Sequence, residues 1–180
     1  MSLKKKEKMI FIGYRGTGKT TVAKILGERH SIPVIDSDKE IEREAGMNIA
    51  EIFSKYGEVG FRDIEETVIA QILANGEPMI LASGGGAILR ESTRNKFRDN
   101  GKVVWLQASP EIILKRIQTD SSTLTARPNL TSLPQLDEIT ELITKRTPLY
   151  KQTATITINT DNHSPQQIAD QCEQLLNCKS

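Results

Sequence analysis

Short apolar runs alternate with longer amphipathic stretches along the whole chain. The runs lie at residues 9–12, 33–35, 79–82, 103–106 and 155–158. Each predicts a β-strand, and their nearly continuous apolar character is typical of parallel strands that are covered on both faces. The stretches between them have helical periodicity and predict helices at 19–30, 39–45, 49–56, 58–75, 92–100, 110–118 and 136–147.

The end of the chain carries a further helix with a clear start. Ser164 is placed to cap it, Pro165 fits its first turn, and Gln167 completes a capping box. Its apolar positions recur at helical spacing and predict a buried face made of Ile168, Cys172, Leu175 and Leu176. Helices that alternate with strands in this way predict an α/β three-layer sandwich with a central parallel sheet. In such sheets ligands bind beyond the carboxyl ends of the strands.

Composition narrows the class without naming a function. The 180 residues are 37% hydrophobic and 26% charged, with a net charge of +1. No apolar run approaches the roughly 20 residues that span a bilayer, and the charge gives no reason to expect nucleic acid or membrane as a partner. The start lacks the apolar segment of a signal peptide. We therefore expect a cytoplasmic protein with a single domain over 1–180. We also expect small-molecule substrates and a monomer, although composition does not fix the oligomeric state.

A phosphate-binding motif follows the first predicted strand directly. Residues 13–20 read G-x-x-x-x-G-K-T, in which glycines let the backbone amides curl around phosphate oxygens at the start of a helix. The lysine adds a mobile positive charge, and the following hydroxyl can bind magnesium. The motif predicts ATP binding with Mg²⁺ by Gly13, Arg15, Gly16, Thr17, Gly18, Lys19, Thr20 and Thr21. The alternative, a glycine-rich turn without a ligand, does not explain the position between strand and helix.

Two carboxylates follow the second predicted strand. If Asp36 and Asp38 are extended, residues two apart project to the same side of the chain. One then suits a magnesium shell, and the other can accept a proton from an attacking hydroxyl or orient it. The alternative is a helix cap followed by acidic first-turn residues. The position of the two aspartates beside a nucleotide-binding loop favours a catalytic and magnesium site over a simple helix cap.

Two further segments are ambiguous when each is considered alone. Glu58 and Glu66 each lie four residues from Arg62, so a solvated helical salt bridge accounts for that spacing. Gly84, Gly85 and Gly86 follow the third predicted strand. They permit close backbone approach to a ligand, and a plain flexible turn is the alternative.

Taken together, these segments resemble the shikimate kinase family. The resemblance rests on G-x-x-G-x-G-K-T, D-x-D, G-E-x-x-F-R-x-x-E and S-G-G-G, which follow in this order between residues 10 and 86. Farther on, Arg127-Pro128 resembles the family's lid, and Arg146-Thr147-Pro148-Leu149-Tyr150 resembles its R-x-P-L-Y segment. The resemblance implies a nucleoside-monophosphate-kinase-like P-loop fold with strand order 2-3-1-4-5. It also implies substrate-binding helices at about 37–75 and a mobile lid at about 118–132.

The resemblance also implies an activity: transfer of the γ-phosphoryl group of ATP, a co-substrate, to the 3-hydroxyl of shikimate. Lys19, Asp38 and Arg127 are then the catalytic residues, with Asp38 as the base and Arg127 on the lid. Thr20 and Asp36 serve Mg²⁺, Arg116 packs on adenine, and residues 159–165 form the opposite wall of the adenine site. The residues implied to bind shikimate are Asp38, Phe61, Arg62, Gly84, Gly85, Gly86 and Arg146.

Two alternatives stay open at the level of sequence. A gluconate kinase or another small-molecule kinase of the same fold shares the phosphate loop and the lid, but it does not predict the paired aspartates together with Phe61-Arg62 and the glycine run. A non-catalytic sensor is expected to lose Lys19, Asp38 or the lid arginine, and this sequence keeps all three. The lid also departs from the family pattern, with Asn129 where leucine is usual.

Overall fold

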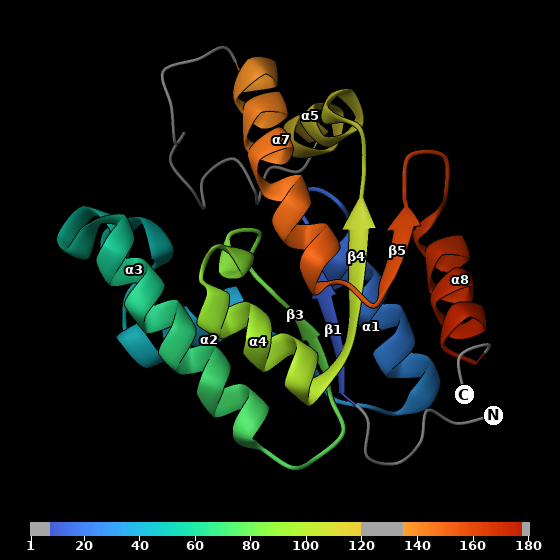
Figure 1. The fold of residues 1–180 in the computed structure, drawn as a ribbon, viewed down its shortest axis with the longest axis horizontal. Coiled ribbons are helices and arrows are strands. Elements are labelled where there is room, and N and C mark those ends of the chain that lie inside the picture. The colour runs from blue at the N-terminus through green and yellow to red at the C-terminus, as the bar shows by residue number, and fades with distance from the viewer. Residues whose placement is uncertain (1–7, 120–134, 178–180) are drawn as a thin grey trace.

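A five-stranded parallel sheet forms the centre of the molecule (Figure 1). The computed structural model describes residues 8–119 and 135–177, with the side chains of 176 and 177 left out. The strands are β1 (Lys8–Ile12), β2 (Val34–Asp36), β3 (Ile80–Ala82), β4 (Gly101–Gln107) and β5 (Ile156–Asn159). Their order across the sheet is β2-β3-β1-β4-β5, with every neighbouring pair parallel, which confirms the predicted order.

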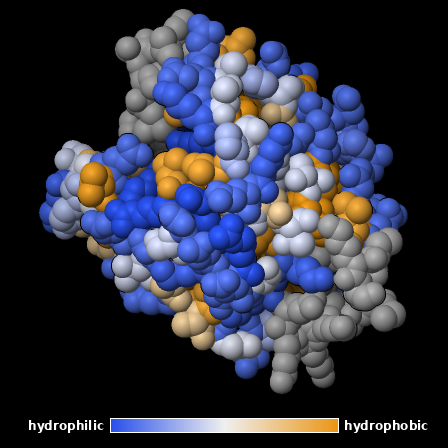
Figure 2. All heavy atoms as spheres, viewed as in Figure 1, coloured by the Kyte–Doolittle hydropathy of each residue, from blue (hydrophilic) through white to orange (hydrophobic). Residues whose placement is uncertain are grey.

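Helices cover both faces of this sheet (Figure 1). They are α1 (Lys19–His30), α2 (Ser37–Ala45), α3 (Ile49–Ala74), α4 (Glu91–Asn100), α5 (Pro110–Thr119), α7 (Gln135–Thr153) and α8 (Pro165–Asn177), with a short 3-10 helix η1 (Ala87–Leu89). Alternate residues of β1 point to opposite faces. Met9 and Phe11 pack with α1 and α8, whereas Ile10 and Ile12 pack with α3, α4 and α7. The three-layer α/β sandwich is therefore confirmed. On the face shown in Figure 2 the surface is mostly hydrophilic.

The register brings three strand ends together. Ala82 at the end of β3 is level with Phe11 in β1 and with Asp36 in β2. Because the strands are parallel, the loops that follow β1, β2 and β3 all leave the same edge of the sheet. These loops carry the phosphate motif, the paired aspartates and the glycine run, so the fold gathers the chemistry that the sequence spreads over 70 residues.

Two predicted helix boundaries differ from the structure in informative ways. The predicted break between 49–56 and 58–75 is present as a kink within α3, where Gly57 adopts φ 68°. A positive φ suits glycine, which has no Cβ to clash. The helix predicted to end at Thr147 continues to Thr153, with Pro148 inside it. The predicted end was wrong, because the turn that follows Pro148 packs against the sheet through Leu149 and Tyr150.

The final helix confirms its predicted start but only part of its predicted face. Ser164 and Gln167 form the reciprocal capping box, with the Gln167 amide 3.2 Å from the Ser164 Oγ and the Ser164 amide 2.8 Å from the Gln167 Oε1. Ile168 and Cys172 are buried, whereas Leu175 is 38% exposed. The prediction for Leu175 was wrong, and Ala169 instead belongs to the buried face together with Ile168 and Cys172. Within the described residues, no helix is long and apolar enough to cross a membrane.

The edge strand β5 and the start of the predicted lid also differ from what the sequence predicts. β5 alternates buried and exposed residues, so the continuous burial expected of every strand is wrong for this edge. Gln118 and Thr119, at the start of the predicted lid, belong to α5. The rest of the predicted lid, including Arg127, lies outside the described residues.

Candidate active site

The phosphate motif forms a tight loop between β1 and α1. Gly13 lies so close to β4 that a Cβ there would come within 2.3 Å of the Leu106 carbonyl oxygen, so no larger residue fits. Gly18 is the N-cap of α1 and, with φ 92°, provides no side-chain cap. The first amides of α1 therefore keep their capacity to donate hydrogen bonds to an anion, at the end of the helix where the dipole favours negative charge.

Lys19 lies inside the loop rather than in solvent. Its Nζ donates hydrogen bonds to the carbonyl oxygens of Gly13 (2.8 Å) and Tyr14 (2.9 Å), and the residue is only 9% exposed. The ammonium group is thus held within the curl of the loop. This is the place where the motif predicts phosphate oxygens.

The two aspartates lie at the junction of β2 and α2, with Asp36 extended and Asp38 already in the helix. Asp36 ends β2 and caps α2, and its Oδ1 accepts a hydrogen bond from the Asp38 amide at 3.0 Å. The premise that both residues are extended was wrong, and the cap geometry offered as the alternative is correct. The capping role does not displace the proposed site, because both side chains still line the same cavity.

Ser37, between the aspartates, ties α2 to the glycine run. Its side chain is fully buried, and its Oγ accepts a hydrogen bond from the Gly84 amide at 2.9 Å. Ser83 in turn donates from its Oγ to the Phe11 carbonyl of β1 at 2.9 Å. The loops after β2 and β3 are therefore fixed to each other and to the sheet. Sequence reasoning treated Ser37 only as a spacer.

One cavity of about 620 Å³ joins these loops. Most of the predicted site residues line it: Arg15, Gly16, Thr17, Gly18, Lys19, Thr20, Thr21, Asp36, Asp38, Gly84, Gly85 and Arg116. Its lining does not include Gly13, Phe61, Arg62, Gly86 or Arg146. The cavity thus contains the phosphate loop and both aspartates, and it reaches the acceptor side at the glycine run.

Thr20 and Asp36 bring two side-chain oxygens together at one side of this cavity. The Thr20 Oγ1 donates to the Asp36 Oδ2 at 3.0 Å. Hydroxyl and carboxylate oxygens are the donors that Mg²⁺ prefers, and the ion usually keeps several waters and takes few protein ligands. The described residues accordingly contain no cluster of three or more His, Cys, Asp or Glu that could hold a metal by itself.

Arg116 and the loop after β5 form another wall. The Arg116 guanidinium donates to the Thr160 carbonyl (2.6 Å), the Thr160 Oγ1 (2.9 Å) and the Gly16 carbonyl (3.3 Å). These bonds fix the plane of the guanidinium between the phosphate loop and residue 160. His163 and Pro165, which fall within the 159–165 segment singled out in the sequence, also line the cavity.

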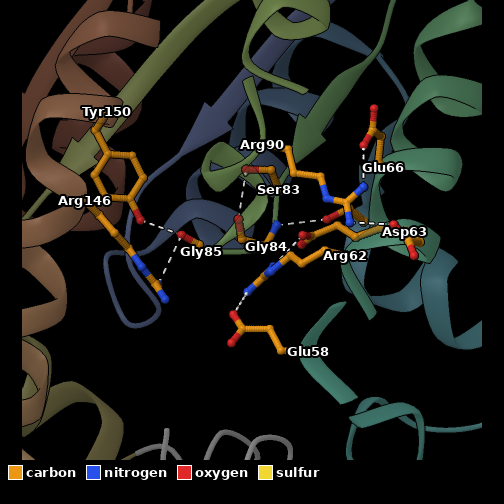
Figure 3. Close-up of polar contacts among 12 residues, drawn as sticks. Glu58, Arg62, Asp63, Glu66, Ser83, Gly84, Gly85, Arg90, Arg146 and Tyr150 are labelled. Atoms are coloured by element: carbon orange, nitrogen blue, oxygen red, sulfur yellow. Dashed lines mark hydrogen bonds and ion pairs between the residues drawn. The ribbon is translucent and has the colours of Figure 1, made fainter. Parts of the chain in front are cut away.

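Arg62 lies beside the cavity, against the glycine run. A Cβ on Gly86 would come within 2.3 Å of its Nη2, so glycine is what lets the guanidinium approach the backbone. The side chain forms an ion pair with the buried Glu65 and another, at 3.6 Å, with the exposed Glu58 (Figure 3). The interpretation of Arg62 and Glu66 as a solvated salt bridge was wrong. Arg62 is only 7% exposed, and Glu66 instead pairs with Arg90 and Lys96.

Phe61 supports this arginine from the core. Its ring is fully buried and stacks on Phe53 with centroids 4.5 Å apart. The Arg62 Cζ lies 5.0 Å from the Phe61 ring centroid, within the range of a cation–π contact. Phe61 therefore positions Arg62 and lies in a hydrophobic cluster, away from the cavity lining.

Arg146 approaches the glycine run from the other side. It is 7% exposed, its Nη1 donates to the Gly85 carbonyl at 3.4 Å, and its Cζ lies 5.7 Å from the Tyr14 ring centroid. Figure 3 shows Arg146 and Tyr150, both from α7, directed at Gly85. In the described part of the chain Arg146 forms no salt bridge with a carboxylate. It is therefore the less neutralised of the two arginines at the glycine run.

The fold and the site together define a P-loop phosphotransferase. On the nucleotide side, the amides of the phosphate loop surround Lys19. On the acceptor side, Asp38 lines the same cavity, and Arg62 and Arg146 lie against the glycine run that follows β3. This combination suits transfer of a phosphoryl group to a small anionic alcohol.

Comparison with known proteins identifies the family. The model of the family described as shikimate kinase matches residues 15–177. A shikimate kinase of Rhodopirellula baltica is 40% identical over 164 residues, which cover 91% of this chain and 87% of that protein. One from Pseudomonas syringae pv. syringae is 39% identical over 160 residues, covering 89% and 90%. The chain belongs to the shikimate kinase family.

The solved structures agree with this assignment. The shikimate kinase from Acinetobacter baumannii in complex with shikimate superposes with a TM-score of 0.89 at 34% identity, covering 97% of this chain and 94% of that one. A shikimate kinase from Bacteroides thetaiotaomicron gives 0.84 at 26% identity, covering 95% and 98%. The predicted fold class and family are confirmed, and the chain is an ATP-dependent kinase.

Proposed function

We propose that the chain transfers the γ-phosphoryl group of ATP to the 3-hydroxyl of shikimate, with the site residues acting as described below. The observation that carries the proposal is the single cavity that contains both Lys19 of the phosphate loop and Asp38. Donor and acceptor must lie within one enclosed space for in-line transfer, because most of the catalysis comes from positioning and charge neutralisation.

The carboxylate of the acceptor is proposed to bind at Arg62 and Arg146, the two arginines at the glycine run. Guanidinium groups match carboxylates in shape and offer paired donors. Arg62 lies at Gly86 and Arg146 at Gly85, so the two approach the same short stretch of backbone from different elements. Because the glycines have no side chains, the substrate can contact the main-chain amides of this stretch.

Asp38 is proposed to orient the attacking hydroxyl and accept its proton. The bond from the 3-oxygen to phosphorus forms as the bond from phosphorus to the β–γ bridging oxygen breaks, and the products are ADP and a phosphate monoester. When ATP binds, the Lys19 ammonium group leaves the loop carbonyls and contacts phosphate oxygens. Its positive charge then offsets the negative charge that develops on the phosphates during transfer. The Arg15 Nε, buried without a hydrogen-bond partner among the described residues, is a further donor in the same cavity.

Thr20 and Asp36 are the residues proposed to hold Mg²⁺. Their oxygens already lie together beside the phosphate loop, which fits a hard cation. When bound, the ion neutralises charge on the phosphates. Contact of Arg116 with adenine, the lid role of Arg127, a cytoplasmic location and action as a monomer also belong to the proposal and rest on the sequence.

An acceptor panel tests the proposal directly. The purified chain would be incubated with Mg-ATP and shikimate, gluconate or a nucleoside monophosphate, and ADP and the phosphate ester would be measured. We expect ester only with shikimate. Ester from gluconate would support another small-molecule kinase. Tight ATP binding without any ester would support the non-catalytic sensor.

A further inference from the structure

The last two turns of α7 fasten that helix to the glycine run. Tyr150 is 2% exposed, and its hydroxyl donates to the Gly85 carbonyl at 2.6 Å. Arg146, four residues earlier on the same helix, donates to the same oxygen at 3.4 Å. Residues four apart lie on one face of a helix, so α7 presents both donors to one carbonyl (Figure 3).

Gly85 lies where the parts of the site meet. A Cβ added there would come within 3.3 Å of the Arg15 amide nitrogen and 3.4 Å of the Gly13 carbonyl, so its backbone packs on the phosphate loop. The next residue, Gly86, packs on the Arg62 guanidinium. Because the Gly85–Gly86 peptide is planar, fixing its carbonyl also fixes the direction of its amide. Tyr150 therefore controls a peptide that touches both halves of the site.

The two distances to the Gly85 oxygen differ in a meaningful way. At 2.6 Å the Tyr150 hydroxyl makes a short, full hydrogen bond, whereas Arg146 at 3.4 Å makes a long one. A buried carbonyl that loses its main donor has a strong tendency to recruit another. Arg146 is within reach and carries several donors. Tyr150 thus satisfies the carbonyl and leaves the guanidinium for another partner.

We propose that Tyr150 is a positioning residue for the acceptor, which orients the Gly85–Gly86 peptide and keeps Arg146 available for the substrate's carboxylate. The inference rests on the proposed function and deepens it. Tyr150 contacts no reacting atom. It acts through Gly85 and Arg146.

Tyr150 also has a packing role, which the experiment must separate from positioning. Its ring stacks on Trp105 with centroids 5.5 Å apart, within the cluster that joins α7 to the sheet. Tyr150→Phe keeps the ring and removes only the hydroxyl. A loss of packing or general stability would affect ATP and shikimate alike, whereas loss of positioning affects chiefly shikimate, because Arg146 and Gly86 lie on the acceptor side.

The first test compares KM for the two substrates. In Tyr150→Phe we expect KM for shikimate to rise on the order of tenfold, as loss of one well-formed hydrogen bond implies, while KM for ATP changes less than about twofold. Tyr56→Phe is the matched control, because Tyr56 is 47% exposed, and it should leave both constants unchanged. Equal rises in both constants, or none, would overturn the proposal.

The second test is a double-mutant cycle with Arg146→Ala. If Tyr150 acts through Arg146, adding Tyr150→Phe to Arg146→Ala should raise KM for shikimate by less than about threefold, well below its effect in the wild type. Fully additive effects would contradict action through Arg146. Failure of the inference stays distinct from failure of the proposed function, because the latter appears as a wild-type protein that does not phosphorylate shikimate at all.

Discussion

The nucleotide half and the acceptor half of the site are built in different ways. The nucleotide half is contiguous, since residues 13–20 supply the loop, the lysine and the helix start. The acceptor half is assembled from α2, α3, the end of β3 and α7, and its buried arginines are held by ion pairs, rings and carbonyls. In the proposed function, backbone amides of one continuous segment bind the triphosphate, whereas side chains from distant segments select the alcohol.

The difference has a consequence for mutation. A change in the nucleotide half should affect transfer to any acceptor, and a change in the acceptor half should leave ATP binding intact. Asp38 lies between the two halves, in the cavity of the first and on the α2 start that Ser37 ties to the second.

Asp38→Asn is expected to have the largest effect. The amide keeps the size of the side chain but cannot accept the proton, so kcat should fall by roughly 10²- to 10⁴-fold. ATP affinity, measured by calorimetry, should change little. A turnover within a few-fold of the wild type in a coupled ADP assay would show that the proton goes elsewhere.

Lys19→Ala is expected to come next. Loss of the charge inside the phosphate loop should lower kcat by about 10²- to 10³-fold with every acceptor that the wild type uses. Lys24→Ala, on the same helix, provides a control outside the loop. Activity retained in Lys19→Ala would contradict the assignment of the cradle.

The contrast between the halves also explains what the sequence can reveal. Residues 13–20 depend on backbone geometry that their own glycines dictate, so the motif predicts the structure. Tyr150 was named only within the R-x-P-L-Y resemblance and received no role, because the predicted helix ended at Thr147 whereas α7 continues to Thr153. Glu65 was noted only as the last residue of the G-E-x-x-F-R-x-x-E motif. Its pairing with Arg62 was not predicted, because only four-residue spacings were considered for that arginine.

Stability of the acceptor half should depend on pH through Glu66. A hydrogen bond from Ser92, followed by the pairing with Arg90 and Lys96, lowers the pKa of Glu66 from 4.5 to about 2. Because the pKa is lower in the folded state, this contribution is complete above about pH 4.5 and is lost as the pH falls toward 2. These groups join α3, which carries Arg62, to α4 and the residue before it.

Glu66→Gln tests that dependence. The partly exposed network contributes no more than about 1 kcal/mol to the free energy of unfolding at pH 7. The variant should lose that amount and should show a weaker decline in unfolding free energy between pH 4.5 and 2. An acid profile parallel to that of the wild type, measured by urea unfolding, would contradict the role of Glu66.

The smallest expected effect belongs to Glu58→Gln. Glu58 is 56% exposed and lies 3.6 Å from the Arg62 guanidinium, where its charge competes weakly with a substrate carboxylate. Its removal should lower KM for shikimate by about twofold, as expected for a screened surface pair. Glu44→Gln, which affects an exposed pair with Arg43 instead, should leave KM unchanged. A higher KM in Glu58→Gln would mean that Glu58 supports Arg62.

Affinity for shikimate relative to its neutral methyl ester tests the acid clamp most directly. The two ligands share every hydroxyl and differ only in the carboxylate, so the ratio of their dissociation constants isolates the contact with guanidinium groups. The wild type should favour the acid, and this ratio should fall by about 10- to 100-fold in both Arg62→Ala and Arg146→Ala. A ratio unchanged in both variants would place the carboxylate elsewhere and contradict the account.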